Sequence, residues 1–246
     1  MRVYAIGDIH GQLDMLRAAH ARIAADREIC GDALAPVVHL GDYCDRGPDT
    51  AGVIQFLIEG VRAGNPWRTV LGNHDRLFRN FLRDPNTVDA RLRSDYTWLT
   101  PNMGGRETLQ SYGVGDGVLP SADELHREAL VGVPAEHIAF LDGLETFVEL
   151  EELVFVHAGI RPGIPMRAQT EDDLIWIRNE FLHDDRDHGK LVVHGHTPVE
   201  TPMHCGNRVN LDTGAGYFRP LTAAVFERRD CWILTDSGRV ALTPQR

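Results

Sequence analysis

The sequence predicts an α/β protein in which a largely parallel first sheet and a mixed second sheet form a sandwich flanked by helices. Three short apolar runs, at 3–6, 35–40 and 68–71, each end at a glycine, and segments with helical spacing, at 12–27 and 50–63, separate them. This β-α-β-α-β order is typical of parallel strands joined by crossover helices. Because ligands of such sheets bind beyond the carboxyl ends of the strands, functional residues are expected directly after each run.

The middle of the chain differs in character. Between residues 77 and 150, aromatic and arginine residues alternate with glycine turns, and helical spacing recurs at 77–83, 122–130 and 135–141. We therefore expect a helical insertion over approximately 77–150. It should pack beside the site and belong to a single domain that spans residues 1–246.

The second sheet is expected from the later part of the chain. Apolar runs at 147–150 and 153–156 indicate a hairpin, and a further strand is expected at 191–193. From 209 to 243, short strands alternate with turns. We interpret this last segment as the rest of a second, mixed sheet that closes the fold.

Composition narrows the functional classes. A net charge of −11, with no block of lysine or arginine, argues against nucleic acid and against anionic membranes as partners. Bound divalent cations would still allow an anionic substrate. The four cysteines lack CxxC spacing, no apolar run reaches transmembrane length, and the chain opens on a predicted strand without room for a signal peptide. A cytoplasmic location is the expectation.

Five segments place potential metal ligands beside glycine. They are Gly7-Asp8-Ile9-His10-Gly11, Gly41-Asp42-Tyr43-Cys44-Asp45-Arg46-Gly47, Gly72-Asn73-His74-Asp75, His157-Ala158-Gly159 and His194-Gly195-His196-Thr197. Carboxylate, amide and imidazole ligands without thiolate suit manganese, iron, zinc or magnesium rather than a structural zinc. Two such ions about 3.5–4 Å apart are a common means of hydrolysing phosphate esters. The sequence therefore predicts a binuclear metal site.

The spacing of these residues indicates which of them share an ion. Asp8 and His10, at i and i+2 beyond a strand, can turn toward one point, because the flanking glycines permit a sharp turn. Asp42, on the neighbouring strand, could bridge two ions. The second ion would be completed by Asn73, His157 and His196. Asp8 taken alone could equally cap the following helix, but five segments that agree on one end of one sheet favour the metal site.

His74 follows the expected ligand Asn73 and would face the same cleft without binding a metal. We assign it as the general acid that protonates the leaving alkoxide, with Asp45 orienting its imidazole and raising its pKa. Asp45 could instead pair with Arg46 or cap the next helix. Arg46 would offer a planar fork of donors to phosphate oxygens, although a surface position is the default for any single arginine.

These segments resemble those of the PPP superfamily of calcineurin-like metallophosphoesterases, which includes the serine/threonine protein phosphatases and the bacterial symmetrical diadenosine tetraphosphatases. The pattern G-D-x-H-G, G-D-x-x-D-R-G, G-N-H-(E/D), H-(A/G)-G and G-H-T runs from Gly7 to Thr197 in family order. The resemblance implies one metal held by Asp8, His10 and Asp42, and a second held by Asp42, Asn73, His157 and His196. It also implies manganese as the first expectation, with iron or zinc as alternatives.

The resemblance further implies which groups bind phosphate. They are Arg46, Asn73 and a second arginine between the fourth and fifth segments, for which Arg178 is the best match. The implied reaction is direct in-line attack on phosphorus by hydroxide held by the metals, without a covalent phosphoenzyme. The expected partner is a phosphoprotein or a phosphorylated small molecule.

The substrate is less firmly indicated. We favour phosphoserine and phosphothreonine monoesters, because Asp45 and the short chain resemble the small bacterial protein phosphatases. Asp75, Ala158 and the 211–214 turn are closer to the tetraphosphatases, so symmetrical cleavage of a dinucleoside tetraphosphate is the alternative. A third hypothesis is a catalytically silent metal-binding scaffold. Such a protein would be expected to have lost a ligand, the acid or the phosphate arginine, and this sequence retains all of them.

A few further residues carry expectations of their own. His194 is left outside the ligand set, His39 is expected to be a core histidine, and Asp212 is interpreted as a structural residue or one that supports the ligands from behind. The insertion's aromatics Phe78, Phe81, Tyr96 and Trp98 are candidates for substrate contact, although ordinary packing is the more frequent role of each.

Overall fold

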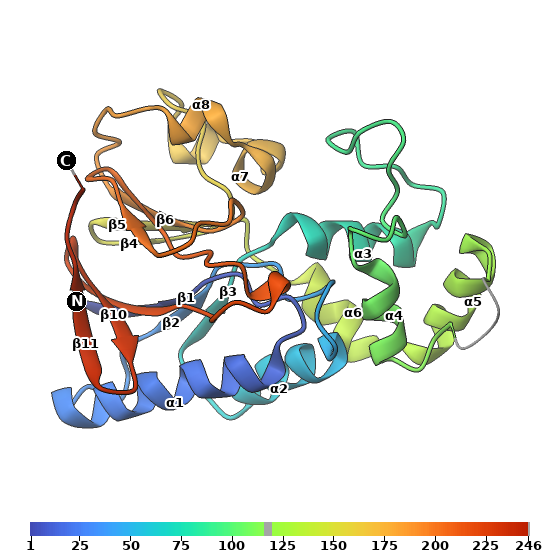
Figure 1. Ribbon diagram of the computed structural model, residues 1–246, viewed down its shortest axis with the longest axis horizontal. Helices are drawn as coiled ribbons and strands as arrows, with labels where there is room; N and C mark the ends of the chain where they lie inside the picture. The colour runs from blue at the N-terminus through green and yellow to red at the C-terminus, as the bar shows by residue number, and fades with distance from the viewer. Residues whose placement is uncertain (116–119, 246) are drawn as a thin grey trace.

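Two β-sheets packed face to face form the centre of the computed structural model, which describes residues 1–115 and 120–245 (Figure 1). The strands of the first sheet, in spatial order, are β11 (Gly238–Leu242), β10 (Asp230–Thr235), β9 (Ala223–Glu227), β1 (Arg2–Ile6), β2 (Val37–His39) and β3 (Trp67–Thr69). Those of the second sheet are β4 (Phe147–Leu150), β5 (Leu153–Val156), β6 (Leu191–His194), β8 (Arg208–Asn210) and β7 (Met203–His204). The predicted two-sheet α/β architecture is confirmed.

Helices cover the outer faces of both sheets. The helices α1 (Leu13–Cys30) and α2 (Thr50–Arg62) lie below the first sheet in Figure 1, and α7 (Glu171–Trp176) and α8 (Asn179–Leu182) lie above the second. Local chemistry sets the helix ends. Gly31 ends α1 with a left-handed φ of 66°, and the Asp49 side chain caps α2 by accepting from the Gly52 N–H. As crossovers, α1 and α2 make β1, β2 and β3 parallel.

The C-terminal strands correct one expectation. We expected residues 209–243 to complete the second sheet, but β9 pairs antiparallel with β1, and β10 and β11 extend this first sheet as a meander. The first sheet is therefore half parallel and half antiparallel, and β7 and β8 remain to extend the second sheet. The alternation of short strands and turns carries no information about which sheet edge a strand will meet. That choice depends on long-range pairing.

The space between the two sheets is filled by apolar side chains. In β1, Val3 and Ala5 belong to the cluster between the sheets, whereas Tyr4 and Ile6 belong to the cluster beneath the helices. A strand buried on both faces must be apolar throughout, which explains the uninterrupted run at 3–6. The core therefore holds both sheets, and with them the loops at their carboxyl ends, in one arrangement.

The insertion is helical, as expected, and lies beside the carboxyl ends of β1, β2 and β3 (Figure 1). It contains α3 (Asn73–Arg83), α4 (Gly105–Ser111), α5 (Ala122–Gly132) and α6 (Ala135–Asp142), whereas residues 147–150 form β4 in the second sheet. The helix α3 starts at Asn73 and not at residue 77. The short helix α4 was not predicted, because it starts on Gly104-Gly105 and has no capping side chain. Residues 116–119 of the expected insertion lie outside the described residues.

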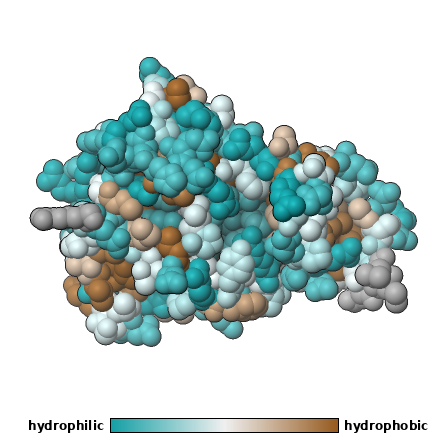
Figure 2. Space-filling model, turned by 45° about the horizontal axis from the view of Figure 1, so that its top comes forward, coloured by the Kyte–Doolittle hydropathy of each residue, from teal (hydrophilic) through white to brown (hydrophobic). Residues whose placement is uncertain are grey.

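Within the described residues, no helix is both long and apolar enough to cross a bilayer. The face shown in Figure 2 is mainly hydrophilic, and its hydrophobic side chains gather mostly at the lower left.

A pair of histidines, one fully buried and one partly exposed, lies beneath the first sheet. His39 is fully buried, as expected for a core histidine, and its Nδ1 donates to the Arg68 carbonyl oxygen at 3.1 Å. Its Nε2 must then accept, and it lies 3.0 Å from Nε2 of His20, whose ring packs on Trp67. This arrangement requires a neutral His39 ring, whose Nε2 accepts the Nε2–H of His20. Burial accordingly lowers the pKa of His39 to about 4 and that of His20 to about 2.

We expect this pair to make the protein acid-sensitive. Below the unfolded-state histidine pKa of about 6.5, both histidines are protonated in the unfolded chain but stay neutral in the folded protein. The free energy of unfolding therefore falls by about 1.4 kcal/mol for each histidine with every pH unit of acidification. His20→Leu should therefore reduce the slope between pH 6 and 4, measured by urea unfolding at each pH. His183→Leu, at an exposed histidine, should keep the wild-type slope. Equal slopes in all three proteins would contradict this account.

Candidate metal centre and active site

The expected ligands meet at one end of the sandwich. Asp8 and His10 follow β1, and Asp42 follows β2. Asn73 opens α3 just beyond β3. Parallel pairing places these three strand ends at one edge of the first sheet. The second sheet supplies the remaining two, His157 after β5 and His196 after β6. Sequence reasoning placed the ligands at strand ends; the packing of two sheets brings both sets together.

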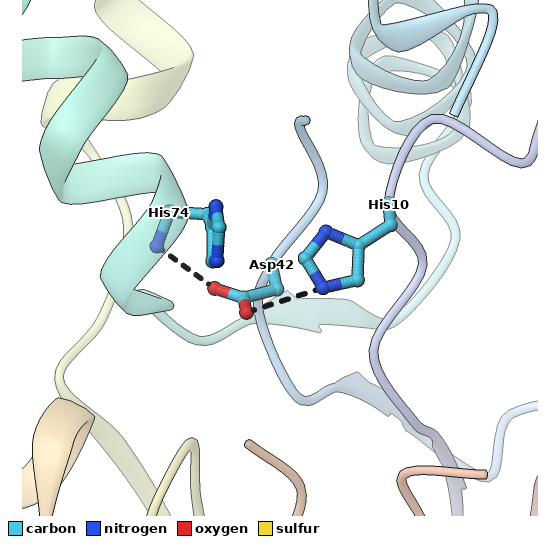
Figure 3. Close-up of side chains that lie close together, drawn as sticks. All are labelled: His10, Asp42 and His74. Atoms are coloured by element: carbon cyan, nitrogen blue, oxygen red, sulfur yellow. Dashed lines mark hydrogen bonds and ion pairs between the residues drawn. The ribbon is translucent and has the colours of Figure 1, made fainter. Parts of the chain in front are cut away.

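One cluster consists of His10, Asp42 and His74, shown in Figure 3. His10 Nε2 lies 3.5 Å from Asp42 Oδ2, and the backbone N–H of His74 donates to Asp42 Oδ1 at 3.0 Å. Each residue offers a ligand atom within 4.8 Å of the others. The tautomer of His10 suits a metal ligand, because its Nδ1 donates to the Cys44 carbonyl oxygen at 2.8 Å and leaves a lone pair on Nε2.

A second cluster consists of Asp42, His157 and His196. The side-chain oxygen of Asn73 lies 3.0 Å from His157 Nε2 and 2.8 Å from His196 Nδ1, and Asp42 Oδ1 lies 3.4 Å from His157 Nε2. His157 Nδ1 donates to the Leu40 carbonyl oxygen at 2.8 Å, which links the second sheet to the first. Asp42 thus belongs to both clusters, which is the position that a bridging carboxylate needs.

Unpaired buried atoms test whether cations fit here. Asp8 accepts the backbone N–H of His196 at 3.0 Å through Oδ2, but its Oδ1 is buried without a hydrogen-bond partner among the described residues. Nε2 of His196 is in the same condition, and both side chains line one cavity. A buried oxyanion without a partner is costly. Carboxylate, amide and neutral imidazole donors around these atoms fit divalent ions of the manganese, iron or zinc type.

Burial governs the charges of this cluster. It raises the pKa of Asp8 well above its usual value, an effect that the negative charges of Asp212 and Asp42 increase. Burial also raises the pKa of Asp42, and it lowers the pKa of His157 to about 4. Neutral imidazoles keep a lone pair for a cation, and a cation would offset the mutual repulsion of the carboxylates.

Asp75 holds the loop that presents Asp42. Its buried carboxylate accepts three backbone N–H groups, from Asp42 at 2.8 Å, Tyr43 at 2.9 Å and Gly72 at 2.9 Å. The Sγ of Cys44 also lies 3.3 Å away. The carboxylate therefore fixes the β2 loop against the first turn of α3. Sequence analysis treated Asp75 as a marker of subfamily and missed this role, which depends on two loops meeting.

The site is built on strained backbone. The ligand-loop residues with positive φ are His10 (49°), Asp42 (50°), Asp45 (73°), Arg46 (68°) and His196 (65°). Such conformations cost a residue with a side chain about 1–3 kcal/mol each and persist where the surrounding structure enforces them. A glycine at residue 72 also allows the β2 and β3 loops to approach closely. A Cβ on Gly72 would lie 2.2 Å from the Asp42 nitrogen, so a larger residue would separate the β2 and β3 loops.

His74 and Asp45 form the expected pair, with His74 Nδ1 2.6 Å from Asp45 Oδ2. The insertion orients Asp45. Trp98 donates Nε1–H to Oδ2 at 2.9 Å, and the Thr108 hydroxyl donates to Oδ1 at 2.7 Å. Trp98 is thus a buried positioning residue. Phe78 and Phe81 are also buried, which leaves Tyr96, among the four aromatics considered, lining the cavity.

The pKa of His74 differs from the expectation. We expected Asp45 to raise the pKa of His74, but burial, with a contribution from the Arg46 charge, lowers it to about 3. Burial in turn raises the pKa of Asp45 to about 7. The desolvation of a fully enclosed ring outweighs the attraction of one carboxylate.

Arg46 faces the cavity as expected. Its guanidinium donates to His10 Nε2 at 2.8 Å and to His74 Nε2 at 2.9 Å, and it lies 5.0 Å from the centre of the Tyr217 ring. Arg178 lines the same cavity from the start of α8. The two predicted phosphate arginines therefore face one space.

This space is a cavity of about 430 Å³. Of the predicted site residues, the structure places Asp8, Asp42, Arg46, Asn73, His74, Arg178 and His196 on its wall. His10, Asp45 and His157 contact that wall from behind. His194 is buried outside the wall and packs on Phe181, which agrees with its exclusion from the ligand set.

Three further charged residues line the wall: two arginines to which the sequence gave no role, and Asp212, which was expected to be structural or to support the ligands from behind. Arg91 and Arg93 come from the insertion, and Asp212 follows β8. Asp212 is the one with a local signal, since it opens a glycine turn at a strand end, as Asp8 and Asp42 do. For the two arginines the sequence offers no comparable signal.

Comparison with known proteins identifies the family. Residues 1–226 match the calcineurin-like phosphoesterases. The chain belongs to this family. Membership of this family makes the protein a metal-dependent phosphoesterase, in agreement with the two groups of candidate metal ligands.

The curated relatives carry two kinds of name. The asymmetrical bis(5'-nucleosyl)-tetraphosphatase PrpE of Bacillus subtilis is 27% identical over 90% of this chain and 89% of its own. Serine/threonine-protein phosphatase 1 of Salmonella typhimurium is 28% identical over 90% of both chains. Among solved structures, a putative diadenosine tetraphosphatase aligns with a TM-score of 0.64 at 21% identity, over 98% of this chain and 94% of that one. This last likeness concerns the fold alone.

We expect Asp75→Asn to weaken metal binding. The amide would turn an NH₂ group toward backbone N–H donors, so the loop carrying Asp42 would loosen, and loss of such a supporting contact typically costs 10–100-fold in metal affinity. Titration of metal-stripped protein with Mn²⁺ measures the effect. Asp142→Asn, an exposed aspartate paired with Arg83, is the matched control. Unchanged affinity in both variants would show that Asp75 does not position the site.

Proposed function

We propose that this chain, acting as a single domain over residues 1–246, hydrolyses phosphoserine and phosphothreonine monoesters by direct attack of water on phosphorus. The observation that supports this substrate class is the buried His74–Asp45 pair, at 2.6 Å, beside the phosphate-facing Arg46. A serine or threonine alkoxide is a strongly basic leaving group that departs only with a proton. The leaving group of a phosphoanhydride is weakly basic and needs no such acid.

The roles of the pair follow from its contacts. Asp45, held by Trp98 and Thr108, keeps the Nδ1 proton on His74 and stabilises the ring when it carries a second proton. Nε2 of His74 accepts from Arg46 in this structure, so it can carry and deliver that proton to the leaving oxygen only after the guanidinium has turned to the phosphoryl oxygens of a bound substrate. Arg46 and Arg178 direct donors at the phosphoryl oxygens, where charge accumulates in the transition state.

Two divalent ions are part of the proposal, with manganese as the first choice. Asp8, His10 and Asp42 would hold one ion, and Asp42, Asn73, His157 and His196 the other. When bound, the ions would lower the pKa of water and would place positive charge beside the phosphoryl oxygens. Asn73 would also contact the phosphate.

Cleavage of dinucleoside polyphosphates is the second candidate. The cavity wall contains Arg91 and Arg93, beyond the two phosphate arginines, and the aromatic rings of Tyr96, Trp176 and Tyr217. Such a wall suits a longer chain of phosphates that ends in a base. The names of the curated relatives include this activity, in its asymmetrical form, whereas the sequence suggested the symmetrical one.

A paired assay with Mn²⁺ separates the candidates. One arm contains a phosphothreonine peptide and the other diadenosine tetraphosphate, and each has an EDTA control that should abolish turnover. We expect faster phosphate release from the peptide. Faster cleavage of the dinucleotide would overturn the monoester proposal; its products, two ADP or ATP with AMP, would distinguish symmetrical from asymmetrical cleavage. No turnover in either arm, with metals bound, would favour the scaffold.

The general acid makes a separate prediction. His74→Asn should lower kcat on the phosphothreonine peptide by about 10²–10⁴-fold. It should lower kcat on p-nitrophenyl phosphate much less, because p-nitrophenolate is a weak base that departs without help. Metal content is measured alongside and should be unchanged. His183→Asn, at an exposed histidine, is the matched control. An equal loss on both substrates would argue against an acid role for His74.

A further inference from the structure

The cavity is bordered by a connection of unusual length. Residues 84–104 join α3 to α4 without a helix or strand of their own, and in Figure 1 this segment rises above α3. Connections this long within a compact fold are uncommon and usually carry function. We call residues 84–104 the rim loop.

The rim loop is held at both ends. Near its start, the buried Asp89 accepts from Arg76 Nε at 2.9 Å. Near its end, the buried Trp98 donates to Asp45 at 2.9 Å, and Gly104 accepts the backbone N–H of Arg46 at 3.4 Å. The stretch between Asp89 and Trp98 is therefore anchored at both ends beside the cavity, and we call it the arch. It is tied to the same residues that are proposed to act on the phosphate.

The arch presents positive charge to the cavity. Arg91, Leu92, Arg93 and Tyr96 all line it. Arg93 is already engaged, because its guanidinium pairs with Asp95 through two hydrogen bonds, of 3.1 and 2.8 Å, and lies 4.8 Å from the centre of the Tyr96 ring.

Arg91 is in a different situation. Its side chain is exposed and makes no hydrogen bond or ion pair with any residue that the structure describes, whereas its backbone N–H donates to Asp89 Oδ1 at 2.9 Å. The protein as a whole carries a net charge of −11. Its charge acts on Asp173, but that carboxylate already accepts two hydrogen bonds from Arg161, of 3.0 and 2.6 Å. Among the described residues, an arginine that faces the cavity without a carboxylate partner of its own is well placed to attract an anion.

We propose that Arg91 binds a second anionic group of the substrate, adjacent to the phosphoryl group that is hydrolysed. This inference rests on the proposed function and deepens it, because it selects phosphorylated sites with a neighbouring carboxylate or phosphate. Arg46 and Arg178 take the phosphoryl group at the base of the cavity. Arg91, on the arch, takes the second group nearer to solvent.

The test compares substrates that differ only in the second group. Three phosphothreonine peptides of equal length carry flanking glutamines, flanking glutamates or an additional phosphothreonine, and p-nitrophenyl phosphate serves as a substrate with one anionic group. Arg91→Ala should lower kcat/KM about tenfold on the peptides with a second anion. It should leave kcat/KM unchanged on the glutamine peptide and on p-nitrophenyl phosphate. The glutamate and diphosphorylated arms distinguish a carboxylate from a phosphate as the preferred group.

Two variants control the experiment. Arg167→Ala removes an exposed arginine outside the cavity wall and should match the wild type on every substrate. Arg91→Lys keeps the charge and should recover part of the loss. Because the Arg91 side chain makes no contact that anchors the rim loop, its replacement should leave Trp98 and Asp45 in place, and the unchanged rate on p-nitrophenyl phosphate verifies this.

Two outcomes would overturn the assignment. A loss of equal size on all four substrates would mean a general electrostatic or structural effect, and no loss on any would mean that Arg91 contacts nothing. If the wild type cleaves diadenosine tetraphosphate but none of the peptides, the proposed function fails on its own. Arg91 is then tested by comparing that dinucleotide with p-nitrophenyl phosphate, so the two failures remain distinguishable.

Discussion

The position of the Asp42 carboxylate is the constraint on which the rest of the site depends. It belongs to both ligand clusters and accepts the backbone N–H of His74 in the first turn of α3. The amino end of a helix carries partial positive charge, which favours a carboxylate there. Asp75 then fixes the backbone on either side of it. A shift of Asp42 would therefore displace a residue shared by both clusters, together with the start of α3, which carries His74.

Burying so many charged and polar groups has an energetic cost that the fold offsets in two ways. Backbone N–H groups and glycine contacts hold the ligand loops in left-handed conformations, which removes their freedom before any ligand arrives. The donor set is also suited to cations, whose charge would counter the repulsion between Asp8, Asp42 and Asp212. The marked departures of these carboxyl pKa values from their ordinary range are typical of a functional site, not of a structural core.

The helical insertion has two functions in this picture. Through Trp98 and Thr108 it fixes Asp45, and so it supports the His74–Asp45 pair from behind. Through the rim loop it also forms part of the cavity wall, with arginines in an otherwise acidic protein. The wall arginines lie between the anchors Asp89 and Trp98, so substitutions at Arg91 or Arg93 can alter the wall while Trp98 still holds Asp45. This offers a physical route by which relatives of similar sequence could act on phosphoproteins or on nucleotides.

The sequence by itself determined the ligand types, their order and their placement at strand ends, because glycine turns after apolar runs are local patterns. It also determined the parallel arrangement of β1, β2 and β3, since helical spacing between short apolar runs leaves few other arrangements. The core position of His39 followed from the same local reasoning.

Only the tertiary structure decided the contacts that join distant segments. The placement of β9 against β1, the clamp of Asp75 on the Asp42 loop, the support of Asp45 by Trp98 and the position of Arg91 all depend on such contacts. The lowered pKa of His74 likewise came from enclosure, which no spacing of residues expresses. The physical reason is the same in each case: pairing across a sheet, burial and desolvation are properties of the packed chain, and a local sequence pattern records only what one segment can do alone.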